Sequence, residues 1–187
     1  MRFQSSLPAV LFALLITAAC KRSTDGQTPP GQTPGSLLLQ SPAFTQGGSI
    51  PKQFTCDGRS ISPALSWSSP PPRTQSLALI VNDPDAPSGT FTHWVLYNLP
   101  AQTRTLPEGL PAKDQLPDGS QQGQNDNDST GYWGPCPPGG SPHRYFFTLY
   151  ALDTKLTLPQ APGAKQLTAA MKRHILASGQ LMGHYHR

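Results

Sequence analysis

The chain has 187 residues, with 14 Lys and Arg against 10 Asp and Glu, and a formal net charge of +4 at pH 7. The basic residues are scattered, and the one short cluster is Lys172 and Arg173. Because nucleic-acid binding normally needs a concentrated basic face, this distribution disfavours it.

Residues 1–19 are predicted to be a signal peptide. A single charge at Arg2 precedes the apolar stretch "LPAVLFALLITAA", which is well short of the about 20 residues that a membrane-spanning helix needs. The order "LITAAC" is similar to a bacterial lipobox, which makes Cys20 the expected lipidated first residue of an exported periplasmic or cell-envelope protein. Thr17 departs from that motif, where leucine is usual, so simple secretion with cleavage nearby stays an alternative. We expect membrane contact only through this anchor.

Two segments that follow the predicted signal peptide differ sharply in composition. Residues 20–36, which after the cysteine read "KRSTDGQTPPGQTPGS", contain no apolar residue large enough to pack. Such a segment is predicted to be a solvated tether. Residues 37–187 have the length of one ordinary domain with a single core.

Short apolar or alternating runs, separated by proline and glycine, are typical of an all-β sandwich. The run "SLALIVN" at 76–82 is nearly continuous in apolar residues, which predicts a central strand covered on both faces. Residues 92–99 and 143–152 are the next predicted strands. "SLLLQSPAF" and "SPALSWSS" are predicted to be weaker edge or bent strands because of their prolines.

The alternation of side chains along a strand predicts which residues share a face. In the strand that begins at His143, Tyr145 lies on the face of His143, and Arg144 lies on the opposite face. The same count in the preceding strand predicts one shared face for His93, Val95, Tyr97 and Leu99.

Residues 100–142 are rich in turn formers and are predicted to be a long functional or unstructured loop. Cys136 lies in this loop, and Cys56 is the other cysteine of the domain. An oxidising compartment would allow these two to form a disulfide, although two separate buried thiols are nearly as well supported. Neither belongs to a C-x-x-C unit, so no structural zinc site is predicted, and no cofactor is expected.

The segment "AKQLTAAMKRHILAS" near the end of the chain is predicted to be one amphipathic helix closed by Gly179. Its apolar stripe recurs at helical spacing and would pack on the sheet. His174, at the end of the stripe, is expected to be an interfacial histidine and not a ligand.

Two stretches carry the residues suited to chemistry. In "DPDAPSGTFTH", Asp83 and Asp85 lie in a stiff turn before His93, and in "GPCPPGGSPHRY", a Pro/Gly turn precedes His143. Taken alone, the aspartates are more simply explained as turn formers. Two imidazoles at one sheet end with an aspartate nearby would form a site for phosphate, sulfate or carboxylate, to which Tyr145 could add a hydroxyl.

These stretches, with "TCDGRSISPALSW" and "AAMKRHILASGQLMGHYHR", resemble the bacterial and archaeal Raf-kinase-inhibitor-like branch of the phosphatidylethanolamine-binding protein family over about residues 37–187. The resemblance implies a mainly β fold, a Greek-key sandwich with a few flanking helices, and a small pocket for phosphoryl groups or similar anions. We expect Arg144 to be a structural ion-pair partner of one aspartate. By motif, the implied pocket residues are Asp83, Asp85, Pro87, His93, Pro138, His143 and Tyr145.

Three departures from the family pattern concern the rim of this pocket. The connection between "DPDAP" and "HW" is much shorter than in eukaryotic members, and Phe91 stands where the bacterial branch commonly has tryptophan. A further pocket tyrosine of eukaryotic members has no assigned counterpart, although Tyr185 is a candidate. These departures affect the expected ligand more than the expected fold.

The function expected from these residues is non-catalytic binding of a small anionic or phosphorylated ligand, with a protein partner as a further expectation. Binding should strengthen as the pH falls through the histidine range. One alternative is a kinase- or protease-inhibitor-like envelope protein with a vestigial pocket. Another is a hydrolase, which is disfavoured because the sequence has no G-x-S-x-G elbow and Ser88 and Ser141 lie in turns.

Overall fold

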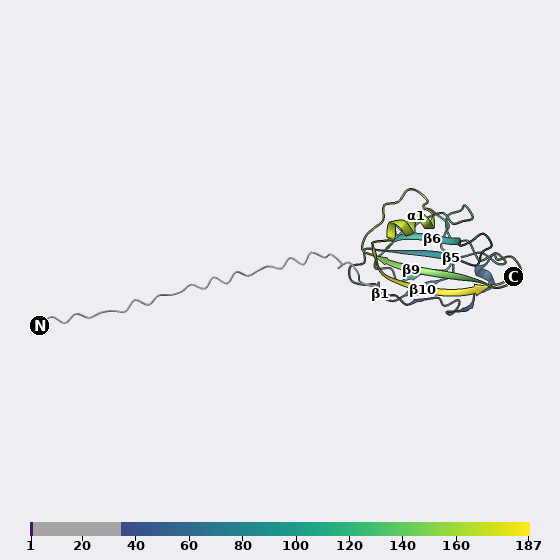
Figure 1. Cartoon of the computed structure of the whole chain (residues 1–187), viewed down its shortest axis with the longest axis horizontal. Helices are drawn as coiled ribbons and strands as arrows, with labels where there is room; N and C mark the ends of the chain where they lie inside the picture. The colour runs from purple at the N-terminus through teal and green to yellow at the C-terminus, as the bar shows by residue number, and fades with distance from the viewer. Residues whose placement is uncertain (2–34) are drawn as a thin grey trace. The chain divides into compact units, whose positions relative to one another are not determined.

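The structure is a computed structural model that describes Met1 and residues 35–187 (Figure 1). The predicted signal peptide, Cys20 and the predicted tether as far as residue 34 lie outside the described residues. Gly35–Ser36, at the end of the predicted tether, form β1, which pairs in parallel with β10 (Ile175–Tyr185). No helix of the described residues is long and apolar enough to cross a membrane.

Two β-sheets form the framework of the described domain, as predicted. The larger sheet has the order β1-β10-β9-β5-β6-β8, with β3 also beside β10, and the smaller sheet has the order β2-β4-β7. The remaining strands of the larger sheet are β3 (Gly48–Ser49), β5 (Ser76–Asp83), β6 (Phe91–Pro100), β8 (Gln121–Gln122) and β9 (His143–Leu152). Those of the smaller sheet are β2 (Leu39–Gln40), β4 (Leu65–Trp67) and β7 (Thr105–Leu106).

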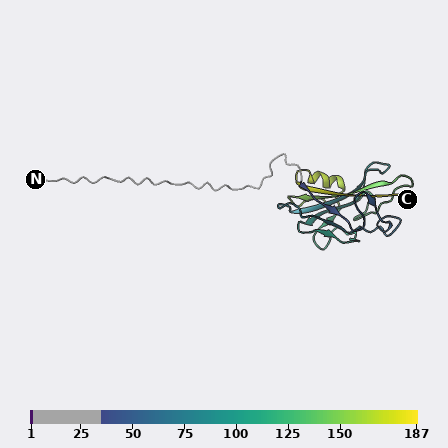
Figure 2. The ribbon, with the colours of Figure 1, turned by 90° about the horizontal axis from the view of Figure 1, so that it is seen from below.

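The two faces of the larger sheet are covered differently. One α-helix, α1 (Ala164–Met171), packs Leu167 and Met171 on one face, whereas the smaller sheet covers the other face. Figure 2 shows α1 on one side of the larger sheet. A single 3₁₀ turn, η1 (Lys52–Phe54), is the other helical element of the described residues, so the few flanking helices expected are reduced to these two.

Strand β5 is the central strand, because it pairs with β6 on one side and β9 on the other. Leu77 and Leu79 point into the core shared with the smaller sheet, and Ala78 and Ile80 point into the core beneath α1. Burial on both faces explains the nearly continuous apolar sequence. The strand predicted at 76–82 is therefore confirmed.

Strand β9 shows the predicted alternation. Tyr145 and Phe147 are fully buried in the core shared with the smaller sheet, whereas Arg144 is exposed on the opposite face. His143 is buried at the start of the same inward face. The strand thus places an imidazole directly above a core tyrosine.

The long C-terminal helix predicted from residue 164 is wrong in its second half. Helix α1 ends at Met171, and Ile175 already begins β10, which pairs with β9 along most of its length. His174 therefore lies in the connection between helix and strand. Gly179 does not close a helix, because it lies within β10 where a side chain would clash with the backbone of Leu37.

The predicted shared face along β6 is also wrong. Val81 pairs with Trp94 and Asn82 pairs with Thr92, so His93 is an extra residue in a β-bulge. A bulge changes the direction in which a side chain points. The His93 ring consequently contacts Tyr145, with ring centroids 5.2 Å apart, whereas Val95 and Tyr97 pack beneath α1 on the opposite face.

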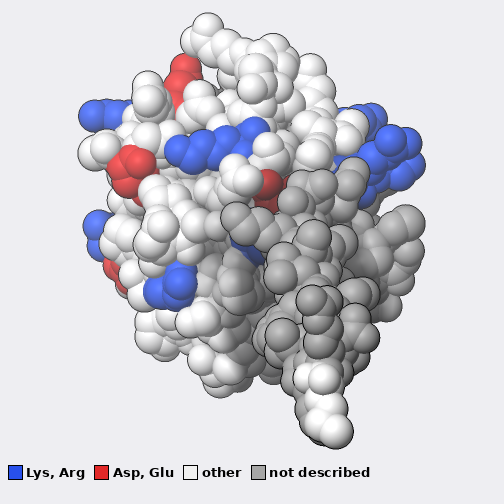
Figure 3. Space-filling view, turned by 90° about the vertical axis from the view of Figure 1, so that its left-hand side faces the viewer, with Lys and Arg blue, Asp and Glu red and all other residues white. Residues whose placement is uncertain are grey.

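Charged side chains are spread over the surface, as the sequence suggested. Figure 3 shows one face, on which Lys and Arg side chains lie in separate places with acidic side chains among them. The described atoms of that face form no continuous basic surface.

Candidate functional site

Three strand ends meet at one end of the larger sheet. Because β5 runs antiparallel to both β6 and β9, the last residue of β5 lies beside the first residues of the other two strands. Asp83, His93 and His143 are thereby brought together and line a pocket of about 320 Å³. A larger hollow of about 550 Å³ over the smaller sheet is lined by no Asp, Glu, His, Lys or Arg side chain, so the chemically suited site is the smaller one.

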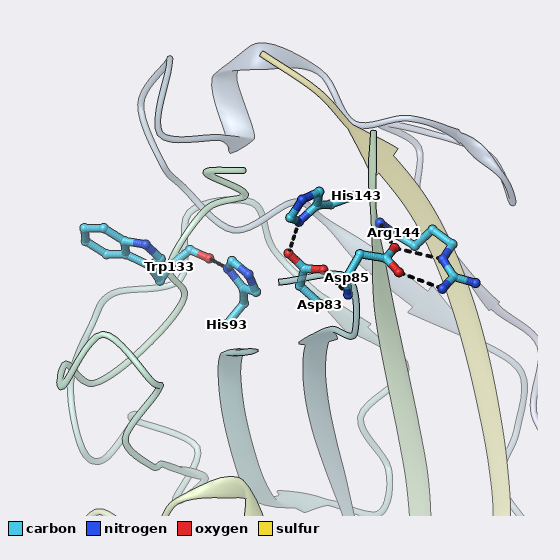
Figure 4. Close-up of polar contacts among 6 residues, drawn as sticks. All are labelled: Asp83, Asp85, His93, Trp133, His143 and Arg144. Atoms are coloured by element: carbon cyan, nitrogen blue, oxygen red, sulfur yellow. Dashed lines mark hydrogen bonds and ion pairs between the residues drawn. The ribbon is translucent and has the colours of Figure 1, made fainter. Parts of the chain in front are cut away.

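Asp83 holds His143 and its own turn in place. The Nδ1 atom of His143 lies 2.7 Å from Oδ2 of Asp83, and the backbone N–H of Asp85 donates to Oδ1 of Asp83 over 2.8 Å (Figure 4). Asp83 and His143 are 3% and 8% exposed. Such buried, charge-assisted contacts fix the orientation of the ring.

His93 is fixed by a backbone group and by two aromatic rings. Its Nδ1 lies 2.7 Å from the carbonyl oxygen of Trp133 (Figure 4). The ring centroids of Phe91 and Tyr145 lie 4.8 and 5.2 Å from its own. Burial lowers the pKa of His93 below its usual value, and this effect outweighs the opposing hydrogen bond to Trp133 and the attraction of Asp83.

The predicted ion pair of Arg144 is present, and its partner is Asp85. The Nε and Nη2 atoms of the guanidinium donate to the two carboxylate oxygens over 2.9 and 2.7 Å, and the backbone N–H of Arg144 adds a third bond of 2.9 Å. The side-chain hydrogen bond from Arg144 lowers the pKa of Asp85 to about 2. The Asp85 carboxylate is therefore occupied outside the pocket lining, and it fixes the turn instead.

The Asp85–Arg144 pair predicts a pH-dependent contribution to stability. The pKa of Asp85 in the folded protein, about 2, lies below its usual 3.8. The pair therefore contributes fully to stability when the pH is above the usual pKa, and this contribution is lost as the pH falls through the folded-state pKa. The partly exposed pair is screened by solvent, and we expect Asp85→Asn to lower the free energy of unfolding by about 1 kcal/mol at neutral pH.

Urea unfolding at neutral pH and at pH about 2 measures this difference. At the acidic pH most of the difference between Asp85→Asn and the wild type should be gone, because the Asp85 carboxyl is then about half protonated in the folded state and almost fully protonated in the unfolded state. Glu108→Gln, which changes an exposed carboxyl with no ion pair among the described residues, should leave stability unchanged at both. If the free energies of unfolding of Asp85→Asn and the wild type differed by the same amount at both pH values, the Asp85–Arg144 pair would not be the source of the pH dependence.

Tyr145 lies beneath the pocket and not in its lining. It is 0% exposed, and its hydroxyl makes no hydrogen bond of normal geometry with the described residues. Burial raises its pKa, and the nearby Asp83 carboxylate raises it further. Among the residues expected at the pocket, Pro87 and Pro138 do line it. The candidate Tyr185 does not line it, and its hydroxyl donates to Asp57.

A disulfide forms one wall of the pocket. Cys56 and Cys136 are bonded, with their Cα atoms 5.3 Å apart, so the pairing that the sequence left open is present in the structure. Cys136 and the two prolines that follow it line the pocket. The backbone N–H of Cys56 also donates to the carbonyl of Pro135 over 3.0 Å. The wall is thus tied to an otherwise distant loop.

Other pocket residues were not predicted from the sequence to line the pocket. Ser88 and Asn127 are polar residues of the lining, and Trp133 also lines the pocket and supplies the carbonyl that binds His93. A backbone carbonyl has no residue type to mark it, and Asn127 resembled any other loop residue. The described residues contain no group of three or more His, Cys, Asp or Glu suited to a metal ion.

Residues 40–186 match the family model for phosphatidylethanolamine-binding protein. The chain belongs to this family. A UPF0098 protein of Methanothermobacter thermautotrophicus is 50% identical over 151 residues, covering 81% of this chain and 99% of that protein. A UPF0098 protein of Pyrococcus horikoshii is 40% identical over 187 residues, covering 98% and 90%. These relatives are of the bacterial and archaeal branch.

Two solved structures have the same fold. A phosphatidylethanolamine-binding protein homologue of Chlamydia trachomatis is 40% identical, with a TM-score of 0.74 over 82% of this chain and 99% of that one. Escherichia coli YbcL, described as a member of the mammalian family, is 31% identical, with a TM-score of 0.76 over 82% and 99%. The expected mainly β fold of this family is therefore confirmed.

Proposed function

We propose that this protein is an exported, non-catalytic binding protein whose pocket takes a small phosphorylated or otherwise anionic ligand. The observation that carries the proposal is the convergence of His93 and His143 on one pocket beside Asp83. Each imidazole has a second ring nitrogen, Nε2, that can make one hydrogen bond with a bound phosphoryl group. A volume of about 320 Å³ is near the lower limit of ligand pockets and suits a phosphoryl group more than a large substrate.

The pocket chemistry favours binding over catalysis. Among the described residues of the lining, Ser88 has the only hydroxyl, and neither imidazole makes a hydrogen bond to it. A nucleophilic serine needs a base within hydrogen-bond reach. The Cys56–Cys136 disulfide supports the export half of the proposal, because such bonds persist in oxidising compartments.

Titration with inorganic phosphate tests this function. We expect the imidazole NMR signals of His93 and His143 to shift, and His143→Ala to lower phosphate affinity by about tenfold through the loss of the hydrogen bond that its ring makes with the ligand. His174→Ala is a matched control, since His174 also bonds an aspartate, Asp153, over 2.8 Å, but lies outside the pocket. Equal losses in the two variants, or no phosphate binding, would refute the proposal.

A further inference from the structure

The hydrogen bonds of the two pocket histidines determine which ring nitrogen carries a proton. A carbonyl oxygen and an ionised carboxylate can only accept, so Nδ1 of His93 donates to Trp133 and Nδ1 of His143 donates to Asp83. In a neutral ring of this kind, Nε2 has a lone pair and no proton. Neither Nε2 makes a hydrogen bond within the described residues, and both rings line the pocket.

The surroundings of His93 keep its ring neutral in the neutral pH range. The titratable groups that influence it are Asp83 on β5, Asp126 in the loop before Trp133, and His143 on β9. The two carboxylates favour the charged ring and His143 disfavours it, but burial has the largest effect and lowers the pKa. The ring of Tyr145, packed edge-on against His93, adds apolar surroundings and no charge.

The pocket therefore presents acceptors to a ligand at neutral pH. An approaching oxyanion meets the lone pair of His93 Nε2 and the negative charge of Asp83. Sulfate carries no proton in this range, so it faces two acceptors with only lone pairs of its own. Hydrogen phosphate carries a P–OH group that can donate to an imidazole nitrogen.

We propose that this pocket binds an oxyanion only together with a proton, and so selects ligands that carry an ionisable P–OH group, such as hydrogen phosphate, over sulfate. An anion without a proton binds only after His93 has taken one from solvent. The proposal rests on the anion-binding function proposed above and specifies its ligand class. The geometry of two Nδ1–H donors turned away from the ligand carries it.

Isothermal titration calorimetry of the full-length protein with sulfate and with inorganic phosphate tests the proposal, at pH about 6.5 and about 7.5. One coupled proton changes affinity about tenfold per pH unit. We expect sulfate affinity to be about tenfold lower at the higher pH. Binding of each sulfate should be accompanied by the uptake of close to one proton, which titrations in buffers of different ionisation enthalpy measure. Phosphate affinity should fall no more than about threefold over the same pH change.

Two variants separate His93 from a general effect of histidine. His93→Gln replaces the acceptor by an amide that can donate, so sulfate affinity should become nearly independent of pH. His184→Gln is the control, because Nδ1 of His184 also lies against a carbonyl, that of Gly47 at 3.1 Å, but outside the pocket. His184→Gln should retain the tenfold change in sulfate affinity between the two pH values.

The outcomes distinguish the two proposals. If sulfate and phosphate bind and lose affinity in parallel, or sulfate takes up no proton, the proton requirement is overturned and the binding function stands. If neither anion binds at the lower pH, the binding function fails and the selectivity fails with it. If His93→Gln keeps the wild-type slope, His93 is not the group that takes up the proton.

Discussion

Replacing Cys56 and Cys136 together by alanine is expected to lower the free energy of unfolding by about 4 kcal/mol. The bond joins residues 80 positions apart, and a cross-link that closes a long loop removes much of the conformational entropy of the unfolded chain. Urea unfolding should show a lower midpoint for the variant. Phosphate affinity should fall as well, because Cys136 and Pro138 form part of the pocket wall.

A reducing agent provides the control for this prediction. Treatment with a dithiol should destabilise the wild type by a similar amount and leave the double alanine variant unchanged. Among the described residues, Cys56 and Cys136 are the only cysteines, so no other thiol of the domain can account for a difference. A loss of less than about 1 kcal/mol would show that the unfolded chain gains little freedom when the bond is absent.

The long strands could be predicted because their local patterns and their burial agree. Strand β5 extends one residue past the predicted run, β6 one residue beyond each end of it, and β9 has the predicted bounds. A proline or glycine follows β5 and precedes both β6 and β9 within two residues of the strand. Where a segment is buried on both faces or alternates strictly, the sequence alone defines it.

The C-terminal segment could not be assigned from its local pattern. Residues 167–175 fit a helical stripe, but the chain leaves the helix after Met171 because β10 pairs with β9 and also meets β1 and β3. Those hydrogen bonds are made with residues far away in the sequence. Tertiary pairing therefore overrides the helical periodicity of the second half.

The site was predictable in its residues and not in its proton arrangement. Asp83, His93 and His143 are marked by their motifs and by their positions at strand ends, and they do meet. The bulge that turns His93 toward Tyr145 depends on the pairing of β5 with β6. The carbonyl of Trp133 that fixes the His93 tautomer is a backbone atom placed by a loop, and no residue pattern identifies it.

Asp83→Asn is expected to raise sulfate affinity at neutral pH by about thirtyfold, or about 2 kcal/mol. Asp83 accepts two hydrogen bonds, one from the backbone N–H of Asp85 and one from Nδ1 of His143. Asparagine has one oxygen and one NH₂ group, so its oxygen accepts from the backbone and its NH₂ faces His143. The His143 proton must then move to Nε2, which becomes a donor, and the carboxylate charge beside the anion is removed.

The tautomer change and the affinity change are measured separately. Imidazole ¹⁵N chemical shifts should show the proton of His143 on Nε2 in Asp83→Asn, and calorimetry should show the gain in sulfate affinity. Asp153→Asn is the matched control, because it alters the Asp153–His174 pair outside the pocket and should leave sulfate affinity unchanged. If Asp83 instead assisted anion binding, by holding a cation or a hydrogen-bond donor against the ligand, Asp83→Asn would weaken sulfate binding. An increase would show that the Asp83 carboxylate opposes the binding of an anion that carries no proton.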